Sequence, residues 1–147
     1  MIKLFTIGFT EKTAAAFFTL LKNAGVNKII DTRLNNVSQL AGFAKGKDLE
    51  FFAKEIGGIA YEHHINLAPT KELLSNYRDK RIDWAQYETQ YISLLDTRNI
   101  IQEIDFEKLN DSCLLCSEHQ PDRCHRRLLA EYLKNANQDI EIIHLIE

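Results

Sequence analysis

The segment from Cys113 to Arg127 concentrates the side chains of this chain that are best suited to chemistry. Its fifteen residues hold all three cysteines, two of the five histidines and three arginines. An apolar run ends within this segment in a polar loop, and a helical pattern follows directly. Open α/β folds build their ligand sites from a strand, a loop and a helix start in this order. We therefore expect the functional site in this segment.

Zinc binding is one chemistry that these residues suggest, because Cys113, Cys116, Cys124 and His125 are all possible ligands of a tetrahedral ion. Cys113 and Cys116, however, flank two leucines in a predicted strand, so their side chains should point to opposite faces of the sheet. No glycine is present here to form the tight turn of a zinc knuckle. The sequence therefore disfavours zinc, and we predict no metal ligand.

Thiol chemistry is a second possibility. Cys116 stands at the end of a predicted strand, and Cys124 stands in the first turn of the next predicted helix, where the aligned amide dipoles favour a thiolate. Either cysteine is therefore a candidate catalytic residue. The alternative is a structural role, because buried cysteines often act as small apolar residues. Cys124, Leu128 and Tyr132 share one helix face at i, i+4 spacing, which favours this structural interpretation.

Two carboxylates are candidates for general acid or base catalysis. Glu118 lies two residues beyond the predicted strand end, close to the helix that carries the arginines. It could transfer protons or simply pair with Arg126. Asp31 ends another predicted strand in the sequence Asp31-Thr32-Arg33. It is either a catalytic acid or base positioned by its neighbours, or half of an ordinary ion pair with Arg33.

Anion binding is the chemistry that the segment favours most. Pro121 suits a first helical turn, whose free backbone N–H groups bind phosphate or carboxylate. Arg123, Arg126 and Arg127 can donate bidentate hydrogen bonds to such a group, and His125 lies beside Arg126. Arg33, at the end of another predicted strand, could add to them. A turn at Gly8 with Thr10 could complete the pocket. The alternative is that the arginines of the helix lie on its solvated face. No Gly-x-Gly-x-x-Gly or Walker sequence is present, which argues against a standard nucleotide cradle.

The elements that must position these residues alternate along the chain. The predicted strands are Ile2–Ile7, Val26–Asp31, Ile59–His63, Ser112–Cys116 and Ile140–Ile146. The predicted helices are Glu11–Asn23 with Thr10 as its N-cap, Leu49–Ile56 with Asp48 as its N-cap, Lys71–Tyr77, one that begins after Asp83, Ile100–Leu109, and Asp122–Asn135. The region from Thr32 to Gly46 has no clear periodicity and is expected to be a loop.

This alternation predicts a single three-layer α/β domain, with a mainly parallel sheet of about five strands and helices on both faces. The polar clusters follow the strand ends, where such sheets bind ligands. One of the two adjacent histidines, His63 and His64, can face that crevice. The aromatic stripe of Trp84, Tyr87 and Tyr91 is expected to be core rather than a platform for stacking bases.

Composition narrows the class of protein. The chain has 147 residues, of which 45% are apolar and 27% charged, so one domain spanning residues 1–147 is the simplest organisation. A net charge of -3 argues against non-specific nucleic-acid binding.

The first residues are too short an apolar stretch for a signal peptide, and no segment approaches the roughly 20 apolar residues of a membrane span. Three cysteines without a disulfide pattern favour a reducing compartment, so we expect a cytoplasmic protein that does not bind membranes.

The chain also resembles the domain of unknown function 488 family over nearly its full length. The resemblance rests on five stretches: Thr6-Ile-Gly-Phe-Thr10, Asp31-Thr-Arg33 with Ser38, Gly58-Ile-Ala-Tyr-Glu-His63 with Leu67, Leu115-Cys-Ser-Glu118 with Pro121 and Cys124-His-Arg126, and the region of His144. It departs from the family pattern at three positions. Thr10 stands where serine is usual, Val37 where proline is usual, and Ala68 where glycine is usual.

The resemblance implies a Rossmann-type α/β domain and a site, but no established activity. It adds Ser38 to the candidates. The predicted binding residues are then Arg126, Arg33, His125, Thr10, Gly8, Ser38 and His63, and the predicted catalytic residues are Glu118, Asp31, Cys116 and Cys124.

Two functions fit these residues. The first is an enzyme that acts on a phosphorylated small molecule, a nucleotide or a nucleic-acid end in an anion-binding crevice. The alternative is a non-catalytic module that senses a nucleotide or nucleic acid. The sequence identifies no cofactor and no oligomeric state.

Overall fold

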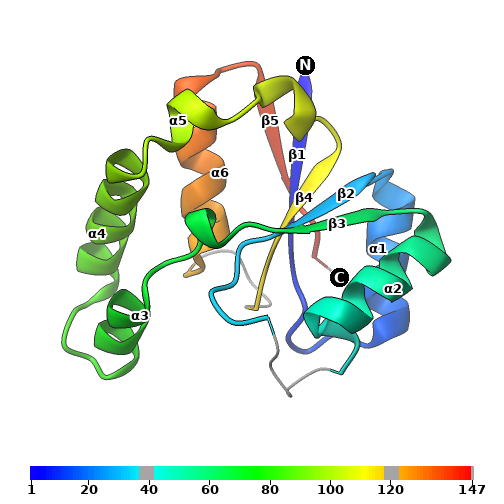
Figure 1. The fold of residues 1–147 in the computed structure, drawn as a ribbon, viewed down its shortest axis with the longest axis horizontal. Helices are drawn as coiled ribbons and strands as arrows, with labels where there is room; N and C mark the ends of the chain where they lie inside the picture. Colours follow the sequence, from blue (N-terminus) through cyan, green and yellow to red (C-terminus); the bar gives the residue numbers. More distant parts are fainter. Residues whose placement is uncertain (37–41, 118–122, 147) are drawn as a thin grey trace.

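A computed structural model describes residues 1–36, 42–117 and 123–146. Its centre is a sheet whose strands lie in the order β3-β2-β4-β1-β5. Every neighbouring pair in this order is parallel. The strands are β1 (Ile2–Gly8), β2 (Lys28–Asp31), β3 (Ala60–His63), β4 (Ser112–Cys116) and β5 (Ile140–His144). The predicted parallel sheet is therefore confirmed, with five strands in the described part of the chain (Figure 1).

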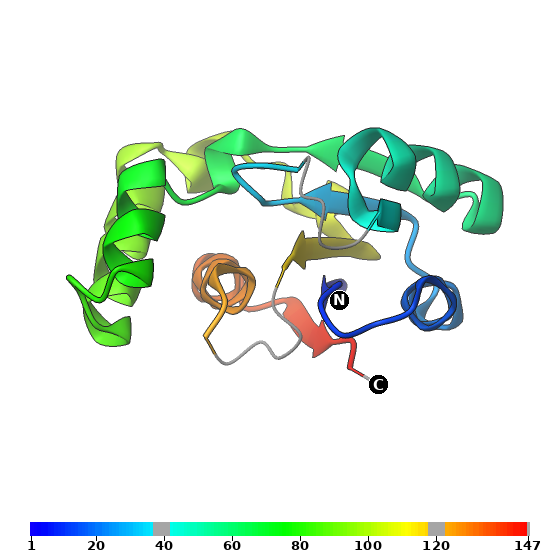
Figure 2. The ribbon, with the colours of Figure 1, turned by 90° about the horizontal axis from the view of Figure 1, so that it is seen from below.

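Helices cover both faces of this sheet. They are α1 (Ala14–Ala24), α2 (Gly46–Gly57), α3 (Lys71–Arg78), α4 (Trp84–Thr97), α5 (Ile100–Glu103) and α6 (His125–Ala136). Figure 2 shows α1 and α2 on one side of the strands and α3, α4 and α6 on the other. The arrangement is the three-layer, Rossmann-like α/β fold that the sequence predicts. Among the described residues, no helix combines the length and the apolar character needed to cross a membrane.

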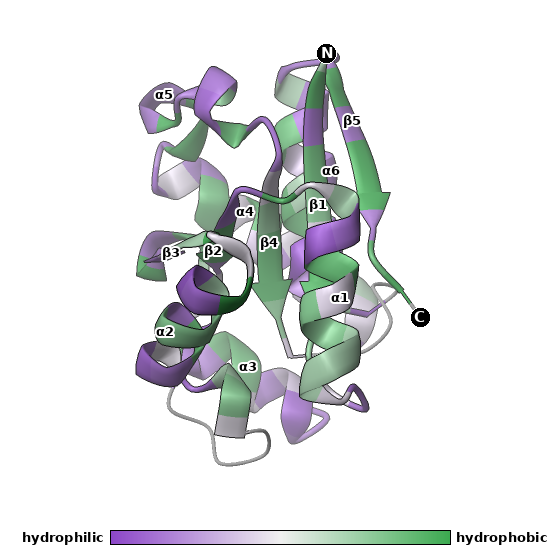
Figure 3. Cartoon of the chain, turned by 90° about the vertical axis from the view of Figure 1, so that its right-hand side faces the viewer, coloured by the Kyte–Doolittle hydropathy of each residue, from purple (hydrophilic) through white to green (hydrophobic). Residues whose placement is uncertain are grey.

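The alternating side chains of β4 explain how the two helical layers are held to one sheet. All five residues of this strand are buried. Cys113 and Leu115 belong to an apolar cluster with Phe17 of α1, whereas Leu114 belongs to a second cluster with Leu128 of α6. The sequence of a strand that is buried on both faces is a continuous apolar run, as in Cys113-Leu-Leu-Cys116. In Figure 3, β4 is accordingly hydrophobic over most of its length, and hydrophilic residues lie on the helices.

Several predicted helix boundaries are wrong. Thr10 does not cap α1; the cap is Thr13, whose side chain accepts a hydrogen bond from the Ala16 backbone N–H at 3.0 Å. The chain first makes a turn, in which the Lys12 backbone N–H donates to the Phe9 carbonyl oxygen and Glu11 has a positive φ of 63°. This turn directs the buried ring of Phe9 into the core before the helix begins.

The other helices differ from the prediction in similar ways. Asp48 is not the cap of α2 but lies in its first turn, because the helix begins two residues earlier at Gly46. The predicted helix Ile100–Leu109 is divided into α5 and the 3₁₀ turn Phe106–Leu109. The predicted start of α6, Asp122, lies outside the described residues, and the observed helix begins at His125 with Cys124 as its N-cap.

The corrected cap of α1 makes a testable prediction. Thr13→Ala removes the oxygen that satisfies the Ala16 N–H, so it should lower the free energy of unfolding by about 1 kcal/mol. Thr13→Ser keeps a hydroxyl and should leave stability nearly unchanged. Urea denaturation followed by circular dichroism measures both variants. Equal stability of Thr13→Ala and the unmodified protein would contradict the assigned cap.

Candidate functional site

A cleft of about 270 Å³ lies at the carboxyl ends of the central strands. Arg33 lines it from the loop after β2, and Cys116 lines it from the end of β4. His125 contributes from the start of α6, and Trp84 and Tyr87 contribute from α4. The strand register explains why these segments meet, because Thr32 and Leu115 are joined by a backbone hydrogen bond of 3.0 Å just beyond the ladder. The expected position of the site, at the strand ends, agrees with this cleft.

Arg33 is held in the cleft wall by Asp31. Its Nε donates to Oδ1 of Asp31 at 2.9 Å, and its Nη2 donates to Oδ2 at 2.7 Å. The same carboxylate also accepts the Arg33 backbone N–H at 3.1 Å and the Tyr61 hydroxyl at 2.6 Å. Both charged side chains are buried, with Arg33 only 4% exposed. Partial burial and the hydrogen bond to Asp31 raise the pKa of Tyr61 to about 12, so Tyr61 remains a donor.

One nitrogen of Arg33 is not satisfied by this arrangement. Nη2 also donates to the Ala44 carbonyl oxygen at 2.6 Å, and the guanidinium lies 5.1 Å from the centre of the Phe9 ring. Nη1 is buried and has no hydrogen-bond partner within the described residues. A buried donor without an acceptor destabilises a protein by about 1–3 kcal/mol, and native structures contain few of them.

Cys116, Cys124 and His125 form a compact group in the same wall. Cys116 and Cys124 are joined by a disulfide bond, which the sequence analysis did not predict. Nδ1 of His125 lies 3.7 Å from Sγ of Cys116. Cys113 is a free, buried cysteine in the core cluster on the opposite face of the sheet. This confirms that the side chains of Cys113 and Cys116 point to opposite faces.

The hydrogen bonds of His125 determine its tautomer. Its Nε2 lies 2.9 Å from the Thr32 carbonyl oxygen, which can only accept, so Nε2 carries the proton. Nδ1 therefore presents a lone pair to the sulfur atoms. Burial lowers the pKa of His125 to about 4, against the opposing effect of the Thr32 hydrogen bond. The imidazole is consequently neutral at neutral pH.

Other predicted residues lie near the cleft without lining it. Arg126 is fully buried, and its Nε donates to Oγ1 of Thr6 at 3.3 Å. His63 donates from Nε2 to the Arg33 carbonyl oxygen at 2.7 Å, which supports the loop after β2. Gly8 pairs with Cys116 in the sheet, and the Thr10 backbone N–H donates to the Ser117 carbonyl oxygen at 3.0 Å.

The remaining predicted residues, Glu118 and Ser38, lie outside the described residues. The structure thus brings Arg33, His125 and the two cysteines into one wall and places Asp31 behind Arg33.

Sequence reasoning missed the aromatic side of the cleft. Trp84 and Tyr87, expected to be core residues only, also line it, with stacked rings whose centres are 5.0 Å apart. Tyr87 is buried and Trp84 half-buried, so the same stripe serves the core and the cleft. Arg123 lines the cleft as an exposed cation. The aromatic pair Trp84 and Tyr87 is the sequence feature that could have indicated this side of the cleft. Its helical spacing, however, does not show which end of the aromatic stripe is exposed to the cleft.

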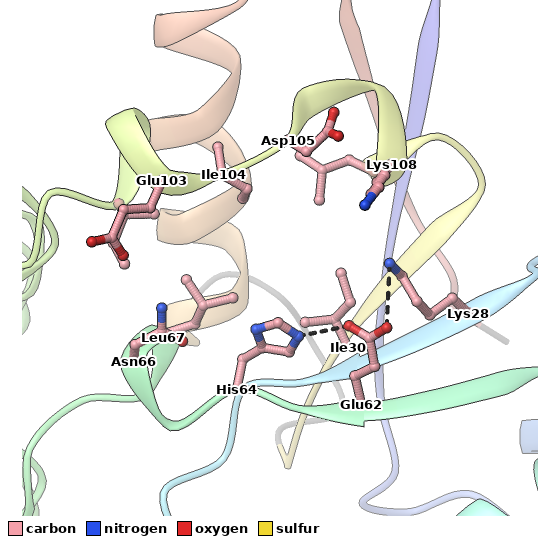
Figure 4. Close-up of a pocket in the computed structure, with 12 residues that line it drawn as sticks. Lys28, Ile30, Glu62, His64, Asn66, Leu67, Glu103, Ile104, Asp105 and Lys108 are labelled. Atoms are coloured by element: carbon pink, nitrogen blue, oxygen red, sulfur yellow. Dashed lines mark hydrogen bonds and ion pairs between the residues drawn. The ribbon is translucent and has the colours of Figure 1, made fainter.

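A second cavity, of about 320 Å³, lies between β3 and the segment that follows α4 (Figure 4). Glu62 points into it between His64 and Lys28. It accepts a hydrogen bond from Nε2 of His64 at 2.8 Å and lies 3.7 Å from Nζ of Lys28. The hydrogen bond from His64 is the main reason that the pKa of Glu62 is lowered. None of the predicted site residues lines this cavity, and the side chains of Glu62, His64 and Lys28 are paired with one another.

The environment of His125 predicts how stability depends on pH. The unfolded chain binds a proton at this residue near pH 6.5, whereas the folded protein binds it only near pH 4. The contribution of this residue to the free energy of unfolding is therefore fully present above pH 6.5. It is lost as the pH falls towards 4, by up to about 3 kcal/mol. His125→Gln should flatten this part of the pH profile of the unfolding free energy. An imidazole that titrates near its ordinary pKa by NMR in the folded protein would contradict the assignment.

Comparison with known proteins adds a family but no activity. The family model described as domain of unknown function DUF488 matches residues 13–133, a range that includes Arg33, Cys116, Cys124 and His125. Neither the curated proteins nor the solved structures compared with the chain contain a significant match. Because the family model covers most of the sequence, the chain belongs to the DUF488 family of domains of unknown function.

Proposed function

We propose that the cleft binds a phosphorylated small molecule, a nucleotide or the end of a nucleic acid. The observation that carries the proposal is Nη1 of Arg33, a buried cationic donor without an acceptor in the described part of the chain. A phosphate oxygen is the strongest common partner for such a nitrogen, since hydrogen bonds between ionised groups are about twice as strong as neutral ones.

The ion pair with Asp31 supports this role of Arg33. Asp31 occupies the Nε and Nη2 edge of the guanidinium, and the Ala44 carbonyl oxygen holds the same end in place. Binding an anion would therefore require little further ordering of this side chain, which lowers the entropic cost of association. The four hydrogen bonds to the Asp31 carboxylate also favour a positioning role for this residue over proton transfer.

The aromatic side of the cleft favours a ligand with a flat ring. Trp84 is half-buried and stacks on Tyr87 with an angle of 15° between the rings. Bases stack on such side chains without a strong preference for sequence. A volume of about 270 Å³ is close to the lower end of the range for small-molecule sites, roughly 300–1,000 Å³. This size supports one nucleotide unit rather than a dinucleotide.

The charge of the protein as a whole supports specific rather than general recognition. With a net charge of -3, the chain does not attract nucleic acid along its whole surface. Within the cleft the charge of Arg33 is balanced by Asp31, whereas Arg123 adds an exposed positive charge at the rim. Such a distribution favours the capture of a single phosphate group over the tracking of a long backbone.

A catalytic version of this function is the second candidate. It is favoured by the distance of 3.7 Å between Nδ1 of His125 and Sγ of Cys116. When the disulfide is reduced, the imidazole could accept the thiol proton, as a general base does for a nucleophilic cysteine. Binding without catalysis is the better-supported function, because Cys116 and Cys124 are joined in a disulfide and the Asp31 carboxylate already accepts four hydrogen bonds.

Ligand binding tests the first version. Isothermal titration with nucleoside monophosphates, phosphosugars and oligonucleotides bearing a terminal phosphate should identify a ligand that carries phosphate. Arg33→Lys keeps a positive charge for Asp31 but lacks Nη1, so it should weaken binding about 10- to 100-fold. Trp84→Leu should weaken the binding of nucleotides but not that of phosphosugars. Lys54→Gln, an exposed charge change on α2, is the matched control. No binding of any probe, or full affinity in Arg33→Lys, would contradict the proposal.

Thiol reactivity tests the catalytic version. In the reduced, folded protein a nucleophilic Cys116 should be alkylated by iodoacetamide faster than buried Cys113, the internal control, and His125→Gln should slow this reaction. Mass spectrometry of the digested protein measures each site, and chromatography shows whether the bound ligand changes chemically. If Cys116 and Cys124 react only after denaturation and the ligand is recovered intact, the protein is a binding module.

A further inference from the structure

We propose that, when its disulfide is reduced, the protein binds a thiophilic transition-metal ion such as Zn²⁺ through Cys116, Cys124 and His125. The possible ligand atoms of these three buried residues lie within 4.8 Å of one another. The group differs from the zinc site that the sequence suggests, because Cys113 is on the other face of the sheet. The prediction that no residue binds a metal is replaced by this proposal.

The distance between the imidazole and the Cys116 sulfur matches that of two ligands on one metal ion, and the two sulfur atoms would move apart once their bond is reduced. Zn–S bonds of about 2.3 Å and Zn–N bonds of about 2.0–2.1 Å at a tetrahedral angle separate sulfur and nitrogen by roughly 3.6 Å. The observed distance between Sγ of Cys116 and Nδ1 of His125 is 3.7 Å. Two thiolates and one imidazole are also a donor set that selects zinc or a similarly soft ion over magnesium or calcium.

The surroundings of His125 supply a second, independent observation. Metal-binding histidines usually donate their other N–H to a carbonyl or carboxylate, which fixes the ring and its tautomer. Here Nε2 donates to the Thr32 carbonyl oxygen at 2.9 Å and lies 3.0 Å from Oγ1 of the same residue. That hydroxyl in turn donates to the Leu115 carbonyl oxygen at 2.8 Å. The lone pair of Nδ1 is thereby directed at the sulfur atoms before any metal arrives.

The disulfide and the metal exclude each other, because ligation needs thiolates. A dithiol reductant supplies two electrons and two protons, the S–S bond breaks, and the reductant becomes a disulfide. The metal then binds both sulfur atoms as thiolates and releases the two thiol protons to solvent. The same group of residues would thus exist in an oxidised, metal-free form and a reduced form that holds the ion.

The number of ligands suggests what kind of metal site this is. Within the described residues the group has three members, and all three line the cleft of about 270 Å³. Structural zinc sites have four protein ligands, whereas catalytic sites have three and leave one position for water or substrate. The fourth position would face the cleft. If the cleft binds a phosphate ligand, as proposed above, an oxygen of that ligand could reach the ion.

Metal titration without any phosphate ligand tests this inference separately from the proposed function. The reduced protein, transferred to buffer without reductant under anaerobic conditions, is titrated with Co²⁺ and then with Zn²⁺. We expect one ion per chain, thiolate-to-cobalt charge-transfer absorption, and loss of that absorption when Zn²⁺ displaces Co²⁺. Zn²⁺ should also protect Cys116 and Cys124 from alkylation.

Variants identify the ligands. Cys124→Ser and His125→Gln should each weaken binding by more than the roughly 10- to 100-fold that loss of an outer hydrogen-bond partner causes. Cys113→Ala should bind normally, and circular dichroism confirms that each variant is folded. The oxidised, unmodified protein should bind no Co²⁺, a test that requires no mutation. Absence of stoichiometric binding by the reduced protein, or binding by Cys124→Ser equal to that of Cys113→Ala, would overturn the proposal.

Discussion

The contact between Asp31 and Arg33 is the interaction on which the cleft depends. Both side chains are buried, and removing two charges from water is unfavourable unless good geometry and further hydrogen bonds offset the loss. The bidentate contact, the Tyr61 hydroxyl and the Ala44 carbonyl oxygen provide those bonds. They join the end of β2 to β3 and to the segment before α2. One guanidinium nitrogen, Nη1, remains outside this network and is buried without an acceptor among the described residues, so the ion pair holds the loop together and leaves one donor of a cleft-lining residue unsatisfied.

The central position of β4 determines which residues lie in the cleft wall with Arg33. This strand lies between β1 and β2, and its end carries Cys116 into the same region as Thr32 and Arg33. The start of α6 then returns Cys124 and His125 to the end of β4. His125 links the two sides, because its Nε2 bonds to the loop after β2 while its Nδ1 faces a sulfur of β4. The cleft is thus joined across the sheet by hydrogen bonds rather than by apolar contact alone.

Anion binding and metal binding make compatible demands on this cleft. Two thiolates would balance the charge of a divalent ion and the Asp31 carboxylate balances Arg33, so Arg123 at the rim would supply the further positive charge for a phosphate ligand. The aromatic rings on α4 line one side of the cleft, and a ligand stacked on them would displace water and lower the local dielectric, which strengthens the remaining polar contacts. A bound ligand would then be held at one end by charge and at the other by stacking, which is how small cofactor sites commonly combine affinity with orientation.

Much of the fold follows from local patterns in the sequence. Buried strands appear as short apolar runs, and the alternation of side chains along Cys113-Leu-Leu-Cys116 correctly separates the two cysteines onto opposite faces. The helix caps were harder to predict, because Thr10 and Thr13 are chemically equal candidates. The turn after Phe9, which depends on the core, selects Thr13. Likewise, the position of α4 relative to the strand ends determines that Trp84 and Tyr87, at one end of the aromatic stripe, line the cleft.

The sequence by itself therefore determines the parallel α/β architecture and predicts a site at the strand ends, since both depend on periodicity and on the order of elements along the chain. It also names four of the residues that line the cleft: Arg33, Cys116, Cys124 and His125. Only the tertiary structure decides their partners, because the pairing of β2 with β4 brings the loop after Asp31 beside Cys116 and His125, from segments more than 80 residues apart. The Cys113–Arg127 segment carries the cysteines and His125, but the carbonyl that orients His125 and the arginine that faces the cleft both come from the loop after β2.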